Sequence, residues 1–402
     1  MNHFDISEIF KAREVLKSVA VETQLLGPTQ LSKDCEIYLK AECLQTTGSF
    51  KLRGAYYKIV NLSDAEKARG VIACSAGNHA QGVALGATNN GIKSLICLPT
   101  TAPLSKVEAT KSLGAEVCMA EGYYDDAYKK ALELKEKEGY TFIHPFDDPL
   151  VIAGQGTIGL EILSQLPDVD AVVVPVGGGG LISGVAFAIK TMKPEVKIYG
   201  VQAEGAPSMK ISLEKGERVT LESVKTIADG ISVKAPGEIT FDMCQKYVDE
   251  IVTVSDDEIA ATILLLMEKQ KMVSEGAGAV AVAAVTFNKL PVKGKKVVCL
   301  VSGGNIDVNV LKRAITRGLV KSGRVVGLTF DLPDQPGPLA EISRIIAELG
   351  GNVISLMHER ASNVGDINSC LLHVEMETRN YEHVEEIKKS LIEAGYKIVK
   401  SY

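Results

Sequence analysis

The lysine at position 51 has neighbours that a surface lysine does not need. It lies in the segment TTGSFKLRGA, residues 46–55, directly behind a glycine, a serine and Phe50. Most lysines lie on the surface, because the ammonium group is charged and its stem is flexible. Two glycines, two threonines and an aromatic ring around one lysine are not typical of a solvated helix face. The segment allows two interpretations, a chemical Lys51 or an ordinary one, and the other motifs must decide between them.

A run of four glycines follows an apolar segment and precedes a helical pattern. It stands in PVGGGGLISG, residues 175–184, behind the apolar letters AVVVPV. Glycines let the backbone approach a ligand closely, and several N–H groups at the positive end of a helix dipole suit a phosphate. A tight turn without a ligand needs only one or two glycines, so the run favours an anion site. The loop lacks the Lys-Ser/Thr ending of the nucleotide P-loop.

A match to the dinucleotide fingerprint, GQGTIG at residues 154–159, is a weaker signal. The fingerprint requires a strand directly before it and an acidic residue about 20 residues further on. Here Pro149 breaks the preceding stretch, and the next strand begins only after Pro167-Asp168. We therefore do not expect a nicotinamide cofactor.

Two further segments place polar groups where a buried strand ends. SAGNHAQG, residues 75–82, opens a helix whose N–H groups suit a small anion such as a carboxylate, and Asn78 can offer an amide to a ring oxygen. A plain helix cap is the competing interpretation of Asn78 and His79. VSGGN, residues 301–305, presents the hydroxyl of Ser302, although such a serine is more often an N-cap.

Length and composition exclude several classes of protein. The chain has 402 residues, 46% hydrophobic and 23% charged, with a formal net charge of −6, which is typical of a globular protein with two or three domains. Negative charge without a Lys/Arg run argues against nucleic acid, and no segment resembles a secretion signal or a membrane span. The eight cysteines form no C-x-x-C pair, so we expect free thiols in a reducing cytoplasm.

The segment from Glu36 to Ser302 alternates short β-branched runs with helical patterns. Runs such as GVIACSA, AVVVPV and KKVVCLVS are apolar at consecutive positions, as in parallel strands buried on both faces. The alternation predicts two open, mostly parallel, doubly wound α/β domains with ligands at the carboxyl ends of the strands. We expect this region to span residues 1–320, with a small subdomain at about 47–148 inserted into a larger one.

The pattern changes near residue 317. RVVGLTFDLPD, GGNVISLMHER, SCLLHVEME and YKIV read as strands, with two amphipathic helices between them. The order βαββαβ predicts a small ferredoxin-like domain over residues 325–402. A short segment at 321–323 is the expected linker.

The motifs around Lys51, Asn78, the glycine run and Ser302 resemble, in order and spacing, those of the fold type II pyridoxal-phosphate enzymes. The similarity is closest to the threonine dehydratases, or threonine ammonia-lyases, and covers about the first 320 residues. The tail, with DLPDQPGPLAEI and GGNV, resembles an ACT domain, a small amino-acid-sensing module. The resemblance implies an α/β fold type II enzyme followed by an ACT domain.

This resemblance also implies a role for each motif residue. Lys51 would hold pyridoxal 5′-phosphate as a Schiff base, with Phe50 beside the ring. Asn78 would bond the 3′ oxygen of the ring, and Ser302 would meet the pyridine nitrogen. The N–H groups around the cofactor phosphate would be those of Gly177, Gly178, Gly179, Gly180 and Leu181. The groups that receive the substrate carboxylate would be Ser75, Asn78 and His79.

The implied reaction is a β-elimination from an amino acid. Burial beside an aromatic ring disfavours the charged form of Lys51, so the freed amine can take the Cα proton. The β-hydroxyl leaves, and hydrolysis yields ammonia with 2-oxobutanoate from L-threonine or pyruvate from L-serine. A serine-preferring dehydratase and an amino-acid sensor without catalysis are the alternatives.

Two properties of related enzymes fit this sequence less well. Serine racemases need a hydroxyl base where this chain has Ala76. The divalent-metal site of those relatives corresponds to GVQAEGAPS, in which Gln202 and Ser208 occupy the carboxylate positions and Ala206 offers only a carbonyl. We therefore expect no divalent metal, while a monovalent ion stays open.

The ACT resemblance implies regulation of the enzyme. The turn with Asp334, Gly337 and Leu339, together with Asn352, would bind an amino-acid effector where two modules meet. Isoleucine is the expected effector because it is the pathway end product, with valine as a competitor, and we expect a homodimer or homotetramer. The alternative is an oligomerisation module that binds no ligand.

Overall fold

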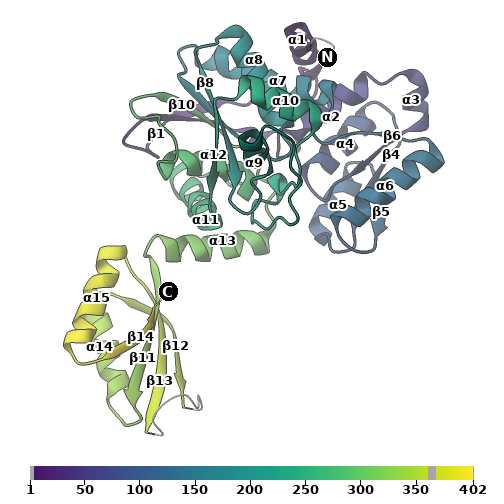
Figure 1. Ribbon diagram of the computed structural model, residues 1–402. Coiled ribbons are helices and arrows are strands. Elements are labelled where there is room, and N and C mark those ends of the chain that lie inside the picture. The colour runs from purple at the N-terminus through teal and green to yellow at the C-terminus, as the bar shows by residue number, and fades with distance from the viewer. Residues whose placement is uncertain (1–3, 361–367, 402) are drawn as a thin grey trace. The chain divides into compact units, whose positions relative to one another are not determined.

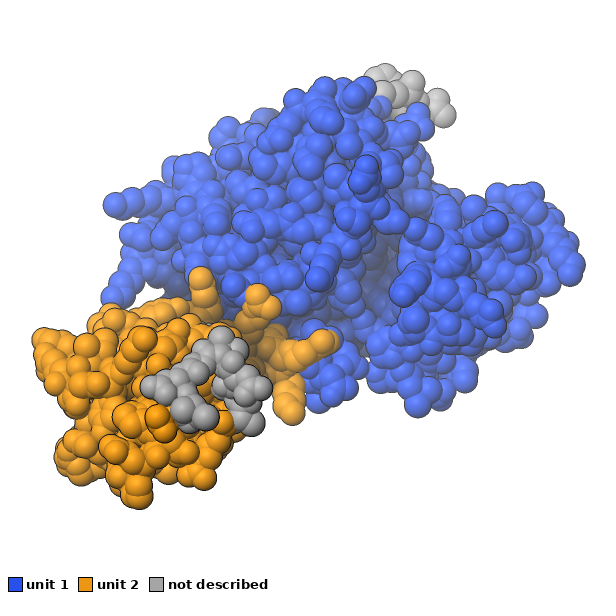
Figure 2. Space-filling model, turned by 60° about the horizontal axis from the view of Figure 1, so that its bottom comes forward, with its two compact units in different colours: residues 1–311 blue, residues 312–402 orange. Residues whose placement is uncertain are grey.

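The computed structural model of the protein describes residues 4–360 and 368–401, and the chain divides into two compact units (Figure 2). The N-terminal unit comprises residues 1–311 and the C-terminal unit residues 312–402. The division falls in helix α13 (Val308–Lys321), ahead of the segment 321–323 that the sequence suggests as a linker. Within the described residues, no helix is both long enough and apolar enough to cross a membrane.

The larger sheet of the N-terminal unit has six strands in the order β1-β2-β10-β7-β8-β9 (Figure 1). Its strands are β1 (Leu25–Thr29), β2 (Glu36–Lys40), β7 (Ala171–Pro175), β8 (Lys197–Ala203), β9 (Glu250–Val254) and β10 (Lys296–Leu300). All neighbours are parallel except β1 and β2. Every residue of β7 is buried, because helices cover both faces of the sheet. This burial explains why the strand is apolar at consecutive positions.

The smaller sheet contains four parallel strands in the order β5-β4-β3-β6. Its strands are β3 (Val71–Cys74), β4 (Ser94–Pro99), β5 (Glu116–Ala120) and β6 (Thr141–Phe142). The helices α4 (Asn78–Asn89), α5 (Leu104–Ser112) and α6 (Tyr124–Glu138) alternate with these strands. Both sheets of the unit are open and mostly parallel, so the predicted α/β fold class is confirmed.

Glycines determine how closely three helices of the N-terminal unit pack. These helices are α2 (Lys51–Val60), α7 (Pro149–Gln165) and α8 (Gly180–Met192). A Cβ atom at Gly154 of α7 would lie 2.6 Å from the carbonyl oxygen of Arg53 in α2, and one at Gly156 would lie 3.0 Å from that of Gly184 in α8. The GQGTIG segment therefore lies inside a buried helix, not at a strand-to-helix turn, and its glycines serve helix packing.

The other helices of the N-terminal unit include two that begin at capping boxes. These other helices are α1 (Ile6–Leu16), α3 (Asp64–Arg69), α9 (Ser208–Lys215), α10 (Glu238–Tyr247), α11 (Asp256–Leu265) and α12 (Gly276–Thr286), with the short 3₁₀ helices η1 (Glu42–Leu44) and η2 (Asp229–Ile231) and the short π-helix η3 (Leu266–Gln270). Ser63 and Ser255 form capping boxes at α3 and α11, with the acid three residues further on. Pro149, which interrupts the strand pattern, is the first residue of α7 behind the cap Asp148.

The C-terminal unit folds in the predicted βαββαβ order. Its elements are β11 (Val325–Pro333), α14 (Pro338–Glu348), β12 (Asn352–Glu359), β13 (Ser369–Glu377), α15 (Tyr381–Glu393) and β14 (Lys397–Ser401). The strands form one antiparallel sheet in the order β12-β13-β11-β14. Phe330 and Leu372 of the sheet are buried against Ile342 and Ile387 of the two helices. This order and topology fit an ACT-like domain.

Four charged side chains are buried together beside the start of α2. Arg53 contacts Glu42 at 2.8 Å and Glu161 at 3.0 Å, and the Nζ atom of Lys40 lies 2.6 Å from Glu161. Two positive and two negative groups balance each other, as buried charges require. Because Arg53 follows Lys51 by two positions, this network holds the first turn of α2 in place.

Candidate active site

Strands from both sheets of the N-terminal unit end at one cavity of about 800 Å³. Strand β3 ends one residue before Ser75, and strand β10 ends two residues before Ser302. The predicted residues that line the cavity are Phe50, Lys51, Ser75, Asn78, His79, Gly177, Gly178, Gly179, Gly180, Leu181 and Ser302. Residues that lie up to 252 positions apart therefore meet, because parallel α/β sheets gather functional groups at the carboxyl ends of their strands.

Lys51 is the first residue of helix α2, and its amine lies inside the cavity. The Nζ atom donates a hydrogen bond to the backbone oxygen of Pro145 at 2.8 Å and lies 5.4 Å from the centre of the Phe50 ring. Burial lowers the pKa of Lys51 from 10.5 to about 8, although the charge of Glu275 acts in the opposite direction. No carboxylate in the described part of the chain forms an ion pair with Lys51. The amine can therefore become neutral near physiological pH, as a lysine that reacts with a carbonyl must.

The glycine loop leaves a backbone-lined cradle at the start of helix α8. A Cβ atom at Gly178 would lie 2.5 Å from the Phe146 ring, and one at Gly180 would lie 2.8 Å from the Cα atom of Phe146. Gly179 has φ +99°, a conformation that favours glycine. The first N–H groups of a helix have no partner within it, so they are available to an anion.

Asn78 is not a plain helix cap. The N-cap position of α4 is occupied by Gly77, and the side chain of Asn78 is held at both ends instead. Its Nδ2 atom donates to Glu275 at 2.7 Å, and its Oδ1 atom accepts from the Nδ2 atom of Asn305 at 2.8 Å. A glycine of the same helix, Gly82, brings α4 close to α2, because a Cβ atom there would lie 3.0 Å from the backbone oxygen of Lys51.

His79 contributes no positive charge to the cavity. Desolvation, and then the charge of Lys51, lower the pKa of His79 to about 3, so the ring is neutral at pH 7. Its Nε2 atom lies 2.8 Å from the backbone oxygen of Ile143 and donates to it in the neutral form. An anion near the start of α4 would therefore meet backbone N–H groups and the hydroxyl of Ser75, not an imidazolium ion.

Ser302 is tied to the segment that carries Lys51. Its side chain is buried with a residue exposure of 2%. The N–H group of Phe50 donates to the backbone oxygen of Ser302 at 3.1 Å, and Ser49 forms a β-bridge with Gly303. The hydroxyl after β10 and the amine at the start of α2 are thus held together by backbone contacts.

The sequence interpretation missed several residues that line the cavity. Phe146 and His144 follow the short strand β6, and Lys106 forms an ion pair with Asp229 at 2.7 Å. The largest omission is Glu275, which precedes helix α12 in the segment SEGAGA and is buried in the cavity wall. The signal in the sequence that could have identified Glu275 was an acid directly before a helix of small, apolar residues. Its burial, however, depends on contacts that the sequence does not show.

The four predicted effector residues do not meet in one copy of the C-terminal unit. The turn from β11 to α14 contains or adjoins Asp334, Gly337 and Leu339. Strand β11 ends at this turn with Pro333, which pairs with Ser369 of β13. Asn352 begins β12 and pairs with Glu377, eight residues further along β13. At about 3.3 Å per residue, the two ends are roughly 26 Å apart. One copy alone therefore does not assemble this set of side chains.

The positions that correspond to the divalent-metal site of related enzymes hold neutral side chains in this protein. The amide of Gln202 is engaged, since it donates to the backbone oxygen of Val176 at 3.2 Å and accepts from the N–H group of Lys210 at 2.8 Å. The hydroxyl of Ser208 is buried without a partner in the described chain. In the C-terminal unit, the ligand atoms of Asp334, His358 and Cys370 lie within 4.8 Å of one another, but Asp334 already pairs with Arg360 at 3.2 Å.

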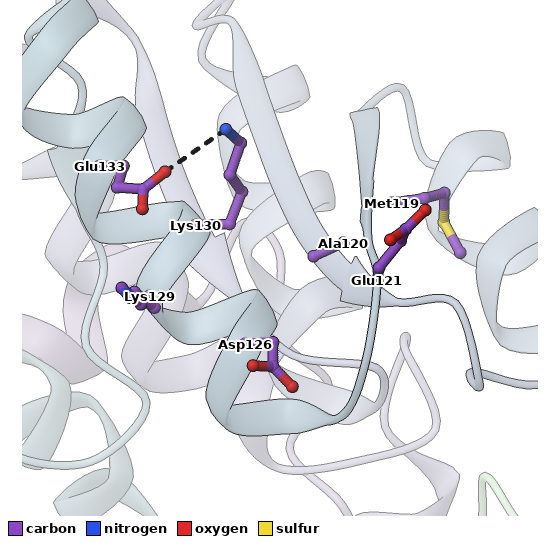
Figure 3. Close-up of a pocket in the computed structure, with 7 residues that line it drawn as sticks. All are labelled: Met119, Ala120, Glu121, Asp126, Lys129, Lys130 and Glu133. Atoms are coloured by element: carbon purple, nitrogen blue, oxygen red, sulfur yellow. Dashed lines mark hydrogen bonds and ion pairs between the residues drawn. The ribbon is translucent and has the colours of Figure 1, made fainter.

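A second hollow, of about 270 Å³, lies at β5 and α6 and differs from the first in chemistry (Figure 3). Its side chains are mostly charged, and Lys130 and Glu133 form an ion pair at 3.4 Å. No predicted site residue lines it. Solvated charges that pair with each other are an ordinary surface feature, so the candidate site is the larger cavity.

Comparison with known proteins shows the family to which the chain is similar. The family described as pyridoxal-phosphate dependent enzyme matches residues 18–303. The chain is 55% identical over 395 residues, 98% of each chain, to an L-threonine ammonia-lyase of Thermotoga maritima. It is 47% identical over 308 residues, 76% of this chain and 94% of the other, to a catabolic L-threonine dehydratase of Escherichia coli. It also resembles the structure of the processed form of threonine deaminase isoform 2 from Solanum lycopersicum, with a TM-score of 0.73 and 43% identity over 78% of this chain and 94% of that one.

Proposed function

The chain belongs to the family of pyridoxal-phosphate-dependent enzymes, and we propose that it converts L-threonine to 2-oxobutanoate and ammonia, and L-serine to pyruvate and ammonia. One observation carries this proposal. A half-buried lysine that can lose its charge, Lys51, lies in the same cavity as a four-glycine loop at a helix start. The relative from Thermotoga maritima, which matches nearly the whole chain, is named for the same reaction.

The residues in the cavity fit pyridoxal phosphate. The cofactor has one phosphate, one aldehyde, a ring nitrogen and a ring oxygen. Side chains at Gly178 or Gly180 would collide with Phe146, so only glycines let the loop backbone lie this close to the cavity wall, where its N–H groups could meet the phosphate. Lys51 would hold the aldehyde, Asn78 the ring oxygen and Ser302 the ring nitrogen. When bound, the cofactor supplies a conjugated ring that accepts the electron pair released at the substrate Cα atom.

The chain's own groups would bind the substrate and move its proton. N–H groups at the start of α4 and the hydroxyl of Ser75 would hold the carboxylate of the amino acid. The Nζ atom of Lys51 would take the proton from the Cα atom, because its lowered pKa makes the amine a base near neutral pH. Neutral His79 would leave the proton on Lys51, since its own pKa of about 3 is too low to compete.

Reduction of the loaded protein with borohydride tests this assignment directly. We expect a stable label on the peptide that contains Lys51 and steady release of 2-oxobutanoate from L-threonine. Lys51→Ala should lower turnover by at least about 100-fold, the lower end of the usual contribution of a catalytic acid or base, while Lys129→Ala on the exposed side of α6 should not change it. A label elsewhere, or full turnover in Lys51→Ala, would refute the proposal.

Two other functions make different predictions. A serine-preferring dehydratase would show a higher kcat/KM for L-serine than for L-threonine, whereas we expect threonine to be preferred. One methyl group changes the binding free energy in a hydrophobic pocket by only about 1–3 kcal/mol. Both substrates should therefore react. A sensor without catalysis would purify without colour and release no 2-oxo acid.

We also propose that the C-terminal unit binds an amino-acid effector and joins copies of the chain. An exposed edge strand supports the second part, since Val353, Ile354, Leu356 and Met357 of β12 are 37–59% exposed. Such an edge can pair with another copy. A homodimer or homotetramer would also let Asp334 of one copy approach Asn352 of another. The eight free thiols, six of them buried, support a cytoplasmic location.

Turnover with and without isoleucine and valine tests the effector. We expect isoleucine to lower turnover and valine to oppose it. Asp334→Ala should abolish the response while leaving turnover without effector unchanged, and Asp242→Ala in the N-terminal unit is the matched control. A response that persists in Asp334→Ala would contradict this site, and a flat response in the unaltered protein would make the C-terminal unit a purely structural part.

A further inference from the structure

Glu275 is a buried acid in the cavity wall for which the implied reaction has no role. It precedes helix α12, and its backbone N–H group donates to the oxygen of Gly303 at 3.1 Å. The residue is 5% exposed. Within the described residues, its carboxylate accepts one side-chain hydrogen bond, from the Nδ2 atom of Asn78 at 2.7 Å. A buried carboxylate with so few partners is unfavourable, which suggests that it has a function.

The surrounding backbone leaves space for this carboxylate. A Cβ atom at Gly303 would lie 2.5 Å from the Oε1 atom of Glu275 and 3.1 Å from the Nδ2 atom of Asn78. A Cβ atom at Gly230 would lie 3.3 Å from the same Oε1 atom. Two glycines from separate segments therefore border the contact between Glu275 and Asn78.

The contact belongs to a chain of hydrogen bonds that determines which way the amide of Asn78 points. Asn305 donates to the backbone oxygen of Thr47 and to the Oδ1 atom of Asn78. An ionised carboxylate only accepts hydrogen bonds, so Glu275 requires the NH₂ group of Asn78 on its side. That NH₂ group has two hydrogens, and one of them stays available to a ligand.

In the described chain, Lys51 of α2, Lys106 of α5 and Asp229 of η2 line the same cavity as Glu275, and Cys43 of η1 interacts with its charge. Desolvation, and then the charge of Asp229, raise the pKa of Glu275 from 4.5 to about 7, against the opposing effects of Asn78 and the two lysines. The carboxylate is therefore ionised above about pH 7 and protonated below it. A protonated carboxyl can donate as well as accept, so it no longer enforces one orientation of the amide.

We propose that Glu275 is a positioning residue of the cofactor site, whose ionised carboxylate holds the Asn78 amide so that its second N–H faces the ring oxygen of pyridoxal phosphate. This inference rests on the proposed function. It adds a pH-sensitive contact that acts through Asn78, not on the substrate. The hold is present at higher pH and is lost as the pH falls through the pKa of Glu275.

The test follows the visible absorption of the cofactor-loaded protein as a function of pH, with no substrate present. In the unaltered protein, we expect a change with a midpoint near pH 7. Glu275→Gln keeps an acceptor for Asn78 but cannot titrate, so the midpoint near pH 7 should disappear. Glu275→Ala removes the acceptor and should weaken retention of pyridoxal phosphate by at least about tenfold, because a hydrogen bond to a charged group is worth about 1.5–3 kcal/mol.

A second variant protects the test against a folding failure of the first. Asp229→Asn removes the charge that raises the pKa of Glu275, so the midpoint should move to lower pH while the absorption change remains. A titration near pH 7 that survives in Glu275→Gln would overturn the inference, as would an unmoved midpoint in Asp229→Asn. Either result leaves the proposed function standing if Lys51 still carries the borohydride label, whereas loss of that label in the unaltered protein refutes both.

Discussion

Arg53 in the N-terminal unit and Arg344 in the C-terminal unit both pair with glutamates, but their surroundings differ. Arg53 is 1% exposed and contacts Glu42 and Glu161 in a balanced network. Arg344 lies on the outside of α14, where its guanidinium meets Glu348 at 2.7 Å in solvent. The first arrangement joins three elements around the start of α2, whereas the second stays within one helix. The buried ion pairs of Arg53 therefore help to fix the position of Lys51, whereas the ion pair of Arg344 lies on the surface of its helix.

The sheets of the two units also differ in how far their strands are buried. Strand β7 is buried along its whole length, whereas all but one residue of β12 are exposed. A strand covered on both faces has a fixed position, so groups at its end can be placed reliably against those of other strands. An open edge is adapted to a partner instead. The N-terminal unit thus holds a defined cavity, whereas the C-terminal unit keeps an open strand edge.

Removal of the buried arginine should have the largest effect on stability. Arg53→Ala leaves two buried carboxylates with only Lys40, so we expect the free energy of unfolding of the N-terminal unit to fall by about 3–5 kcal/mol. Arg344→Ala should leave the unfolding midpoint almost unchanged. Urea unfolding followed by circular dichroism, with the transitions of the two units fitted separately, measures both. Equal losses would contradict the distinction between the units.

Lys51 should destabilise the cofactor-free protein at neutral pH. Its pKa is about 8 in the folded chain and 10.5 when solvated, so between these values the unfolded state binds more protons and stability rises with pH. Below pH 8, the buried charge costs about 3 kcal/mol. Lys51→Met should therefore be more stable than the unaltered protein at pH 7, with the difference vanishing above pH 10.5. Lys129→Met should show no such dependence, and a pH-independent gain in Lys51→Met would point to packing instead.

The glycine loop should tolerate a methyl group less well than a surface turn does. Gly179 and Gly294 both have positive φ, but a Cβ atom would meet Thr240 at 2.8 Å in the first case and nothing within 4 Å in the second. We expect Gly179→Ala to lose about 1–3 kcal/mol from overpacking and to bind pyridoxal phosphate more weakly. Gly294→Ala shares the backbone strain and should keep its cofactor affinity. Equilibrium dialysis measures the affinity, and equal affinities would remove the case for a cradle.

A substitution at the open edge of the C-terminal unit should change the assembly of the protein more than its stability. Ile354→Lys places a charge on β12, which we expect to shift the protein to smaller species in sedimentation with a change in stability of less than about 0.5 kcal/mol. Ile392→Lys, on the exposed side of α15, is the matched control and should leave assembly unchanged. If both variants sediment alike, β12 does not join copies of the chain.

Sequence reasoning succeeded where a local pattern has a direct physical cause. Consecutive apolar residues predicted the parallel strands, and four adjacent glycines marked the start of α8. It failed for Glu275, because one acid before a helix has the same letters whether it is solvated or buried. Sequence reasoning also could not show that Asp334 and Asn352 lie far apart in one copy, because their distance depends on how β11 and β12 pair with β13.

The sequence alone determined the fold class and the order of elements, and it pointed to Lys51 and the glycine loop as candidates, since each depends on residue type and on neighbours a few positions away. Tertiary structure alone decided that Lys51 loses its charge easily, that Asn78 is held between Glu275 and Asn305, and that Arg53 is buried. These properties arise from desolvation and from contacts between distant segments. Both appear only when the chain has folded.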